Sequence, residues 1–99
     1  MPAYFVIHNR VTDDDAMQTY LAKAVETLMA HGAEVLVVAD DSTVVEGTPE
    51  FLRTIIIKFE TREQAMAWYE SPEYQVALPI RLAATEGHAV LVDGLVMPG

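Results

Sequence analysis

Short runs of β-branched and aromatic residues alternate along this chain with longer stretches in which apolar residues recur at helical spacing. The runs predict strands at residues 3–8, 35–46, 53–60 and 86–92. In the second run, the polar residues 40–42 interrupt the apolar pattern, and we expect residues 43–46 to continue the same strand after a β-bulge. One strand is therefore expected at the start of the chain, two in the middle and one at the end.

The stretch between the first two strands has the pattern of an amphipathic helix. From Met17 to Met29, apolar residues recur at spacings of three and four, which gives one apolar stripe. Thr12 is the expected N-cap, and the last of the acidic residues 13–15 is its capping-box partner. Since acids also favour the positive end of a helix, we interpret this acidic run as a cap rather than a metal site. Gly32 is expected to end the helix.

A second helical region covers residues 61–84 and is expected to contain a joint. Ser71 is typical of an N-cap and Pro72 of the first helical position, where a missing N–H costs nothing. One helix should therefore end near Glu70 and another begin at once. Pro79 predicts a kink or break in the later helix. The earlier helix is expected to begin with a capping box formed by Thr61 and Gln64. Its buried side is expected to consist of Ala65, Trp68 and Tyr69.

The predicted order of elements is β-α-β-β-α-β, within a single domain over residues 1–99. With right-handed crossovers, this order gives the split βαβ or ferredoxin-like arrangement, an α+β fold. The third strand then lies between the first and the second, and the fourth lies on the other edge of the first. Both helical regions cover one face of a four-stranded antiparallel sheet.

The strands are apolar on both of their faces. An antiparallel sheet with one solvated face alternates apolar and polar residues, whereas residues 35–38, 55–57 and 89–92 are continuously apolar. Two helices can cover only one face, and an apolar patch of that size is not typical of a soluble monomer. A second copy of the chain is the simplest cover, through a twofold contact. The sequence therefore predicts a homodimer that is paired through the sheet face, in the manner of a dimeric α/β barrel.

The composition narrows the range of partners. The apolar fraction is 52%, above the usual 45–50%, which fits an interface in addition to a core. With 15 acidic and 6 basic residues, the net charge of −9 argues against nucleic acid and against an anionic membrane as partners. The absence of cysteine excludes disulfides, thiolate nucleophiles and zinc–thiolate sites. No signal peptide or transmembrane segment is evident, so we expect a soluble cytoplasmic protein.

The joint between the two later helices carries a recognisable motif. The letters WYESPEYQ at residues 68–75, followed by ALPIR at residues 77–81, resemble the uncharacterised family numbered 1330 among the domains of unknown function. The resemblance covers essentially the whole chain and implies a ferredoxin-like dimeric α/β barrel, with no established activity. Where that family usually has a glycine, an arginine and two further glycines, this chain has Ala33, Val38, Ala39 and Asp40. An anion-binding role for that arginine is therefore not carried over.

Three histidines raise the question of a metal site. In the predicted fold the first strand ends where the fourth begins, so His8 and His88 are expected to be near neighbours. His31 ends a helix of about 18 residues, which at a rise of ~1.5 Å per residue is roughly 27 Å long. This distance excludes a three-histidine site within one subunit, and we expect neither a metal nor another cofactor.

The same edge of the sheet is predicted to gather the candidate catalytic residues His8, Arg53, Tyr69 and His88. A general base beside a cation and a phenol, in a pocket between sheet and helices, would suit a small oxo-acid or an enolisable carbonyl. In the alternative interpretation, Tyr69 belongs to the core, Arg53 pairs with Glu46 or Glu50, and the histidines are solvated.

Aromatic residues near the joint are candidates for ligand binding, together with one arginine. They are Trp68, Tyr69, Tyr74 and Arg81. Tyr74 and Arg81 lie on one face of the expected helix, so they can equally pack against each other at the joint.

These observations favour a homodimeric α/β-barrel protein that holds a small organic ligand, an oxo-acid or an aromatic compound, between sheet and helices. The enzymatic alternative is a cofactor-independent lyase, isomerase or monooxygenase, by analogy of fold alone. The other alternative is a non-catalytic structural or interaction dimer whose aromatic residues fill the core.

Overall fold

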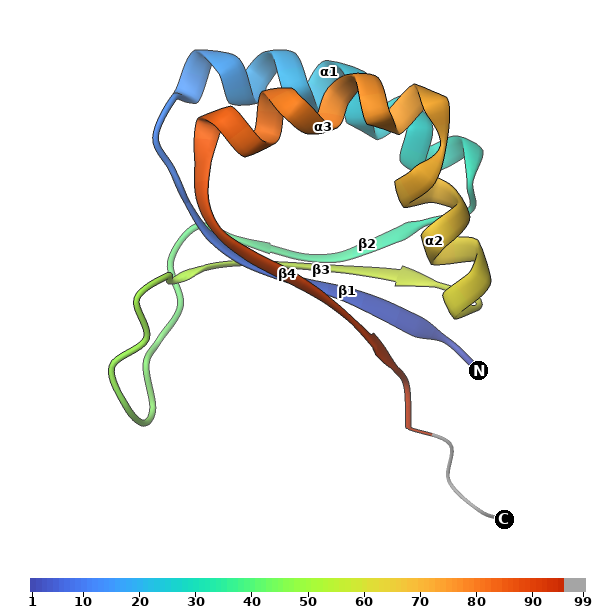
Figure 1. The fold of residues 1–99 in the computed structure, drawn as a ribbon. Coiled ribbons are helices and arrows are strands. Elements are labelled where there is room, and N and C mark those ends of the chain that lie inside the picture. The colour runs from blue at the N-terminus through green and yellow to red at the C-terminus, as the bar shows by residue number, and fades with distance from the viewer. Residues whose placement is uncertain (96–99) are drawn as a thin grey trace.

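The structure is a computed structural model, and it describes residues 1–95. Four strands and three helices follow one another in the order β-α-β-β-α-α-β (Figure 1). Their bounds are β1 Ala3–Val11, α1 Asp14–Ala30, β2 Glu34–Ala39, β3 Arg53–Phe59, α2 Arg62–Glu70, α3 Pro72–Ala84 and β4 Thr85–Asp93. The predicted order is confirmed, with the second helical region divided into α2 and α3 at the expected joint.

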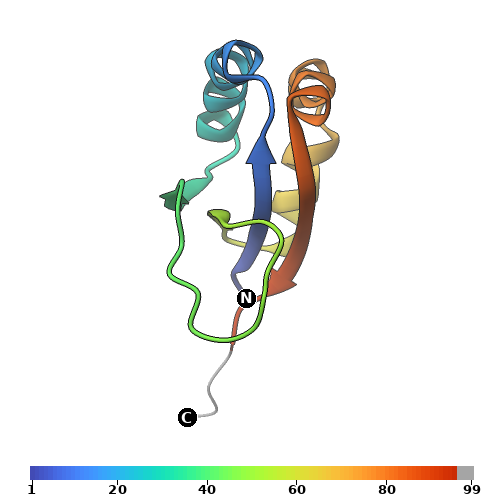
Figure 2. The ribbon, with the colours of Figure 1, turned by 90° about the vertical axis from the view of Figure 1, so that its left-hand side faces the viewer.

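The strands form one antiparallel sheet in the order β2-β3-β1-β4. All three helices lie on the same side of this sheet, and no helix covers its other face, where the loop 40–52 lies beside one end of the strands (Figures 1 and 2). The ferredoxin-like fold is therefore confirmed, including the place of β3 between β1 and β2 and of β4 on the outer side of β1.

Alternation along the two central strands places the core. In β1 the buried positions alternate with half-buried ones, and the buried ones face the helices. β3 pairs with β1 and repeats the pattern, with Ile55, Ile57 and Phe59 buried. The two strands thus present matching apolar rows to the helix layer. The largest side chains of the resulting core are Phe5, Tyr20, Phe59, Trp68 and Tyr74.

The start of α1 differs by one residue from the prediction. Asp13, not Thr12, is the N-cap, and its carboxylate accepts a hydrogen bond of 3.0 Å from the backbone N–H of Ala16. The backbone N–H of Thr12 instead donates to the carbonyl of Ala84, at 2.7 Å. This link to the end of α3 removes Thr12 from the helix, and the next acidic residue takes the cap.

The second strand is shorter than predicted. Residues 43–46 do not resume it, and the irregularity in the pairing lies earlier, between Val35 and Val37. Pairing with β3 stops at Ala39, and residues 40–52 leave the sheet as a long loop (Figure 2). A hydrogen bond of 2.6 Å from the hydroxyl of Ser42 to the carbonyl of Leu52 ties the two ends of this loop together. Because this hydrogen bond holds residues 42 and 52 together, the chain turns away from the sheet and β2 does not continue.

The expected break at Pro79 does not occur. α3 runs from Pro72 to Ala84 with Pro79 inside it. One face of the helix buries Tyr74, Ala77, Leu78, Arg81 and Ala84. Burial of this face on both sides of the proline outweighs the loss of a single backbone hydrogen bond.

The two later helices, α2 and α3, begin at the predicted caps. Thr61 caps α2 by accepting from the backbone N–H of Gln64, at 3.0 Å. Ser71 caps α3: its hydroxyl accepts from the backbone N–H of Tyr74, at 3.2 Å, and donates to the carbonyl of Trp68, at 2.8 Å. A single buried hydroxyl thus connects the end of one helix to the start of the next.

Substitution of Ser71 by alanine is expected to destabilise the fold by about 1–2 kcal/mol, because the cap of α3 and the link to Trp68 are lost together. Urea unfolding followed by circular dichroism measures the loss. Thr61→Ala, which removes a more exposed cap, serves as the control and should cost less. Equal losses in the two variants would show that burial of the Ser71 hydroxyl adds nothing to the cap.

The helices differ in how they contact the sheet. α1 packs mainly against α3, whereas α2 packs against β1, β3 and β4. Among residues 1–95, no helix is both long enough and apolar enough to cross a membrane.

Candidate functional site

A cavity of about 190 Å³ lies between α1 and the sheet. Apolar side chains of α1, β1, β2 and β3 form most of its wall. The polar side chains on the wall come from four different elements, β1, α1, β3 and α3: Asn9, Tyr20, Arg53 and Arg81. An apolar chamber with a few convergent polar groups is the usual form of a small-molecule site.

Arg81 is the most unusual of these polar residues. It lies in the last turn of α3 and is only 8% exposed. Its Nε atom has no hydrogen-bond partner among residues 1–95, and no carboxylate in that part of the chain forms an ion pair with it. A buried cation normally has both kinds of partner, because transfer of a charge out of water is costly.

The Arg81 guanidinium lies near the phenol groups of three tyrosines, Tyr74, Tyr20 and Tyr69. The phenol oxygens of Tyr20 and Tyr74 lie 2.9 Å apart and share a buried hydrogen bond. Burial raises the pKa of the Tyr20 phenol, and the nearby Tyr74 raises it further, so Tyr20 is neutral and cannot act as a base. Burial alone would lower the pKa of Arg81, but the oxygens of Tyr74 and Tyr20 outweigh that effect, so Arg81 stays charged.

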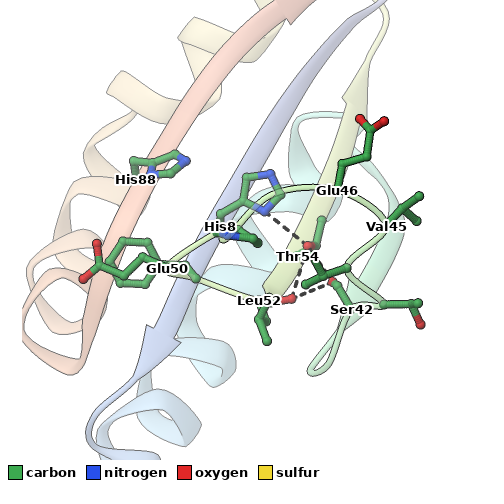
Figure 3. Close-up of a pocket in the computed structure, with 12 residues that line it drawn as sticks. His8, Ser42, Val45, Glu46, Glu50, Leu52, Thr54 and His88 are labelled. Carbon is green, nitrogen blue, oxygen red and sulfur yellow. Dashed lines mark hydrogen bonds between the residues drawn. The ribbon is translucent and has the colours of Figure 1, made fainter.

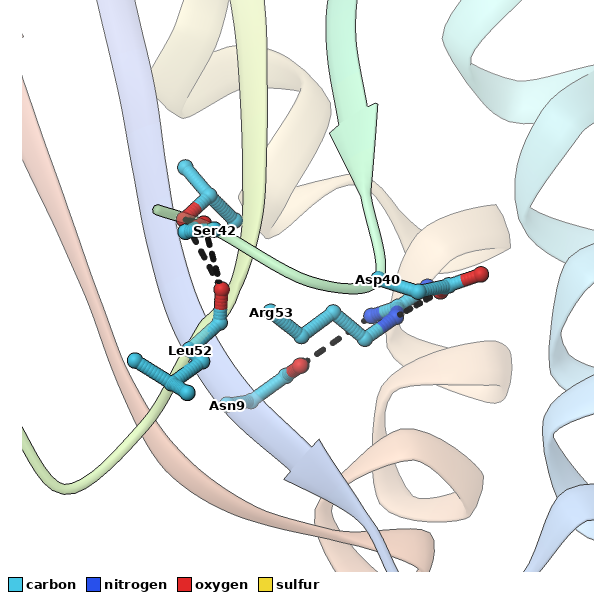
Figure 4. A network of polar contacts seen from close by, with 6 residues as sticks. Asn9, Asp40, Ser42, Leu52 and Arg53 are labelled. Carbon is cyan, nitrogen blue, oxygen red and sulfur yellow. Dashed lines mark hydrogen bonds and ion pairs between the residues drawn. The ribbon is translucent and has the colours of Figure 1, made fainter. Parts of the chain in front are cut away.

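Arg53 and Asn9 form a second polar group at the cavity wall (Figure 4). The Nη1 of Arg53 donates to the side-chain oxygen of Asn9, at 3.1 Å, and its Nε donates to the carboxylate of Asp40, at 3.2 Å. The expectation that Arg53 pairs with Glu46 or Glu50 was wrong. Because residues 40–52 leave the sheet, Asp40 remains beside Arg53 at the end of the β2–β3 pairing.

A second cavity of about 400 Å³ lies on the other side of Arg81, between α3 and β4. Asn9 and Arg81 border both cavities, and Tyr69 borders this one. Glu86 lies on its wall, where its carboxylate forms a 2.8 Å ion pair with Arg10.

The opposite face of the sheet has a wider and more open hollow of about 680 Å³, which the loop 40–52 forms with the sheet (Figure 3). His8 and His88 are directly paired across β1 and β4, with ring centroids 5.6 Å apart. The Nδ1 of His8 lies 3.2 Å from the hydroxyl of Thr54, and the ring of His88 packs against Phe51. The expected proximity of the two histidines is confirmed.

The predicted catalytic group is not assembled in one pocket. Arg53 lines the cavity under α1, and Tyr69 lines the cavity beside α3. His8 and the ring of His88 face the open side of the sheet, although His88 also borders the cavity beside α3 at the sheet edge. The physical reason is strand alternation: His8 pairs with Thr54 and with His88, whereas its neighbour Asn9 pairs with Arg53.

The four candidate ligand-binding residues divide into two that belong to the core and two that border cavities. Trp68 and Tyr74 are 2% and 1% exposed and pack against each other, with ring centroids 4.0 Å apart. The indole N–H of Trp68 donates to the hydroxyl of Thr27, at 3.0 Å. These two residues belong to the core, whereas Tyr69 and Arg81 border cavities.

His31 lies at the C-terminal cap of α1, where its Nδ1 is 2.9 Å from the carbonyl oxygen of Thr27. It lines none of the cavities described above. Residues 1–95 contain no cluster of three or more side chains that could hold a metal ion.

Sequence reasoning missed Asn9 and Tyr20. The signal for Asn9 was its position: it follows Ala3, Phe5 and Ile7 at alternate positions of β1, and it is 3% exposed. A polar residue in phase with a buried row is a candidate site residue. Tyr20 gave no such signal, since its ring fits the apolar stripe of α1 and only the folded structure places its hydroxyl beside Arg81.

The arrangement of sheet and helices is that of the ferredoxin-like α/β proteins. Solved structures with this fold include a protein of unknown function from Rhodopseudomonas palustris (TM-score 0.81, 14% identity, 97% of this chain and 84% of that chain). Another is SnoaB, a cofactor-independent oxygenase from Streptomyces nogalater (TM-score 0.65, 9% identity, 97% and 95%). A third is a dimeric ferredoxin-like protein of unknown function from Thermobifida fusca (TM-score 0.51, 11% identity, 93% and 90%). At these identities the likeness concerns the fold alone.

Within that class, the sequence identifies a particular family. The pattern of the family described as "Domain of unknown function (DUF1330)" matches residues 2–95. The chain therefore belongs to the DUF1330 family, as the motif at the helix joint indicated. None of the curated protein sequences matches this one.

Proposed function

We propose that this protein is a homodimer that binds a small organic molecule, an oxo-acid or an aromatic compound, in the cavity between α1 and the sheet. The observation that carries the proposal is the cavity itself. It is partly open and mostly apolar, and polar groups from β1, β3 and α3 line it together. Such a combination provides burial for a ligand's body and hydrogen bonds for its orientation.

Binding is favoured over catalysis by the chemistry of the wall. The described polar side chains that line the cavity are an amide, a phenol and two guanidinium groups. None of them is a base near neutral pH, since the pKa of the Tyr20 phenol is raised. A cofactor-independent lyase, isomerase or monooxygenase remains the second candidate, because SnoaB has this fold and acts without a cofactor.

The homodimer is the second part of the proposal. The uncovered sheet face carries apolar residues on every strand, and a ferredoxin-like protein of similar fold is dimeric. A second copy covers that face without closing the cavity, which lies on the helix side. We place the dimer in the cytoplasm, where a chain with no cysteine loses nothing by the lack of disulfides.

The binding proposal predicts that a compound from a panel of small carboxylates, phenols and quinones raises the melting temperature. At about a hundred times its dissociation constant, a ligand stabilises the folded state by about 2.7 kcal/mol. Val25→Trp, which enlarges a side chain on the cavity wall, should abolish the shift. Differential scanning fluorimetry on both proteins measures it.

Met29→Trp is the matched control, since Met29 is exposed one turn further along α1 and does not line the cavity. It should leave the shift unchanged. A panel without a single stabilising compound would count against a ligand in this fold. Equal shifts in the two tryptophan variants would place the ligand elsewhere.

A further inference from the structure

We propose that the ligand is a monocarboxylate with a short apolar body, and that its carboxylate binds the guanidinium of Arg81. This inference rests on the proposed function and deepens it, because it names the chemical class that the cavity selects. Its basis is a charge that the described chain leaves without a counter-charge, at the wall of a cavity that is otherwise mostly apolar.

The charge of Arg81 is the first step of the argument. The residue is more than nine-tenths buried, its Nε has no hydrogen-bond partner, and no carboxylate of residues 1–95 pairs with it. Its polar neighbours are the phenol groups of Tyr74, Tyr20 and Tyr69, which are hydrogen-bonding groups and not carboxylates. They can orient the guanidinium, but they cannot neutralise it. A bound anion supplies both the missing charge and the missing acceptor.

The distribution of charge in the chain supports the same conclusion. Of the 6 basic residues in a protein with a net charge of −9, both Arg53 and Arg81 line this cavity. Arg53 already has a carboxylate partner in Asp40, at 3.2 Å. One positive charge is thus left uncompensated at the wall, which fits a ligand with a single negative charge. A phosphate ester would carry a second charge with no partner there.

The rest of the wall fits an apolar body. Leu21 and Val25 of α1 and Val35 and Val38 of β2 line the cavity and are each more than one-third exposed. They form an apolar opening at the edge strand, away from Arg81 on α3. A ligand with its carboxylate at Arg81 would bury its body against these side chains and remove them from water.

The volume limits the size of that body. A cavity of about 190 Å³ has room for about six water molecules at ~30 Å³ each. Sites for drug-sized molecules are larger, at roughly 300–1,000 Å³. A monocyclic aromatic acid or a short-chain fatty acid fits this room, whereas a nucleotide does not. The cavity on the other side of Arg81 is a poorer anion site, because Glu86 borders it.

Calorimetric titration of the full chain with matched probes tests the inference. The probes are benzoate and hexanoate, with benzamide and hexanamide as neutral counterparts of the same size. We expect at least one acid to bind about tenfold or more tightly than its amide. Arg81→Met should weaken binding of that acid by about ten- to a hundredfold, which is the effect of one charge-assisted bond pair. The same substitution should leave amide binding within about threefold.

Arg62→Met is the control for net charge. Arg62 pairs with Asp93 at 3.1 Å, is about half exposed and lines none of the cavities described above, so its loss should leave acid binding unchanged. Amides that bind as tightly as acids, or an Arg81→Met variant that retains acid binding, would refute the carboxylate class but leave small-molecule binding intact. If other compounds of the wider panel also fail to stabilise the protein, the proposed function fails too.

The stability of Arg81→Met without ligand distinguishes a ligand-binding arginine from a purely structural one. In a low-salt buffer free of carboxylates and phosphate, Arg81→Met removes an uncompensated buried charge and keeps an unbranched side chain. Its urea midpoint should therefore equal or exceed that of the unsubstituted protein. A saturating concentration of the carboxylate ligand should raise the urea midpoint of the unsubstituted protein alone, so that it exceeds the midpoint of Arg81→Met. A clearly lower midpoint for Arg81→Met without ligand would make Arg81 a structural residue and overturn the proposal.

Discussion

Replacement of Tyr74 by alanine is expected to lower the free energy of unfolding by about 3–5 kcal/mol, the usual cost of removing a buried aromatic ring. Tyr74 is 1% exposed and packs against Trp68 with the two rings tilted, at a centroid distance of 4.0 Å. Its hydroxyl is also the hydrogen-bond partner of Tyr20. The substitution therefore opens a cavity at the centre of the core and leaves a buried hydroxyl without its partner.

Tyr74→Phe separates these two effects. It keeps the ring and removes the hydroxyl, so it should cost about 1–3 kcal/mol, the range for a buried partner left unsatisfied. Urea unfolding monitored by tryptophan fluorescence suits both variants, because Trp68 reports directly on this contact. A small effect of both substitutions would mean that the core does not depend on the helix joint. Since domains of this size have a stability of about 5–15 kcal/mol, the alanine variant should be close to unfolding.

The fold could be predicted because several local signals agreed. Thr61 and Ser71 were predicted as N-caps because capping depends only on residues within one helical turn. Both are N-caps in the structure. The strands were evident from continuous apolar runs, and right-handed crossovers left one arrangement for them. The failures arose where contacts between distant parts of the chain overrode these local signals. Thr12 was displaced from its cap by a hydrogen bond to Ala84, which is distant in sequence.

The site could be predicted only in part, because the sequence does not show which alternate residues of each strand face the helices. In a sheet that is apolar on both faces, alternation does not show which residues turn toward the helices. His8 and Arg53 were assigned to one edge correctly but to one face wrongly, because the pairing of Asn9 with Arg53 sets the phase. The place of Arg81 beside Tyr20 depends on contact between α1 and α3 and has no local signature.

The uncovered face of the sheet has an apolar row across its centre. The pairings place Val37, Ile56, Val6 and Val90 side by side, one from each strand. The histidine pair lies in the next row toward one end, and Lys58, Tyr4 and Val92 lie in the next row toward the other. A central apolar row with polar groups on either side is the usual anatomy of a protein interface. The row crosses all four strands, so a second sheet can cover it whole.

Val90→Glu is expected to convert the proposed dimer into a monomer at micromolar concentration. Val90 is 48% exposed in the single chain, so the substitution should cost the monomer little. In a twofold dimer it would bury two unpaired carboxylates, each at a cost of several kcal/mol. The dissociation constant should therefore rise by ~1,000-fold or more. Sedimentation velocity should show the unsubstituted protein at twice 10.9 kDa and the variant at 10.9 kDa.

Val76→Glu is the matched control, because Val76 is 63% exposed on α3, on the opposite side of the sheet from this face. It introduces the same charge and should leave the dimer intact. Unsubstituted protein that sediments at 10.9 kDa would remove the homodimer from the proposal. A dimer that survives Val90→Glu but not Val76→Glu would assign the interface to the helix layer. Since the proposed ligand cavity lies on the helix side, monomeric Val90→Glu should still bind the ligand, which separates assembly from binding in one variant.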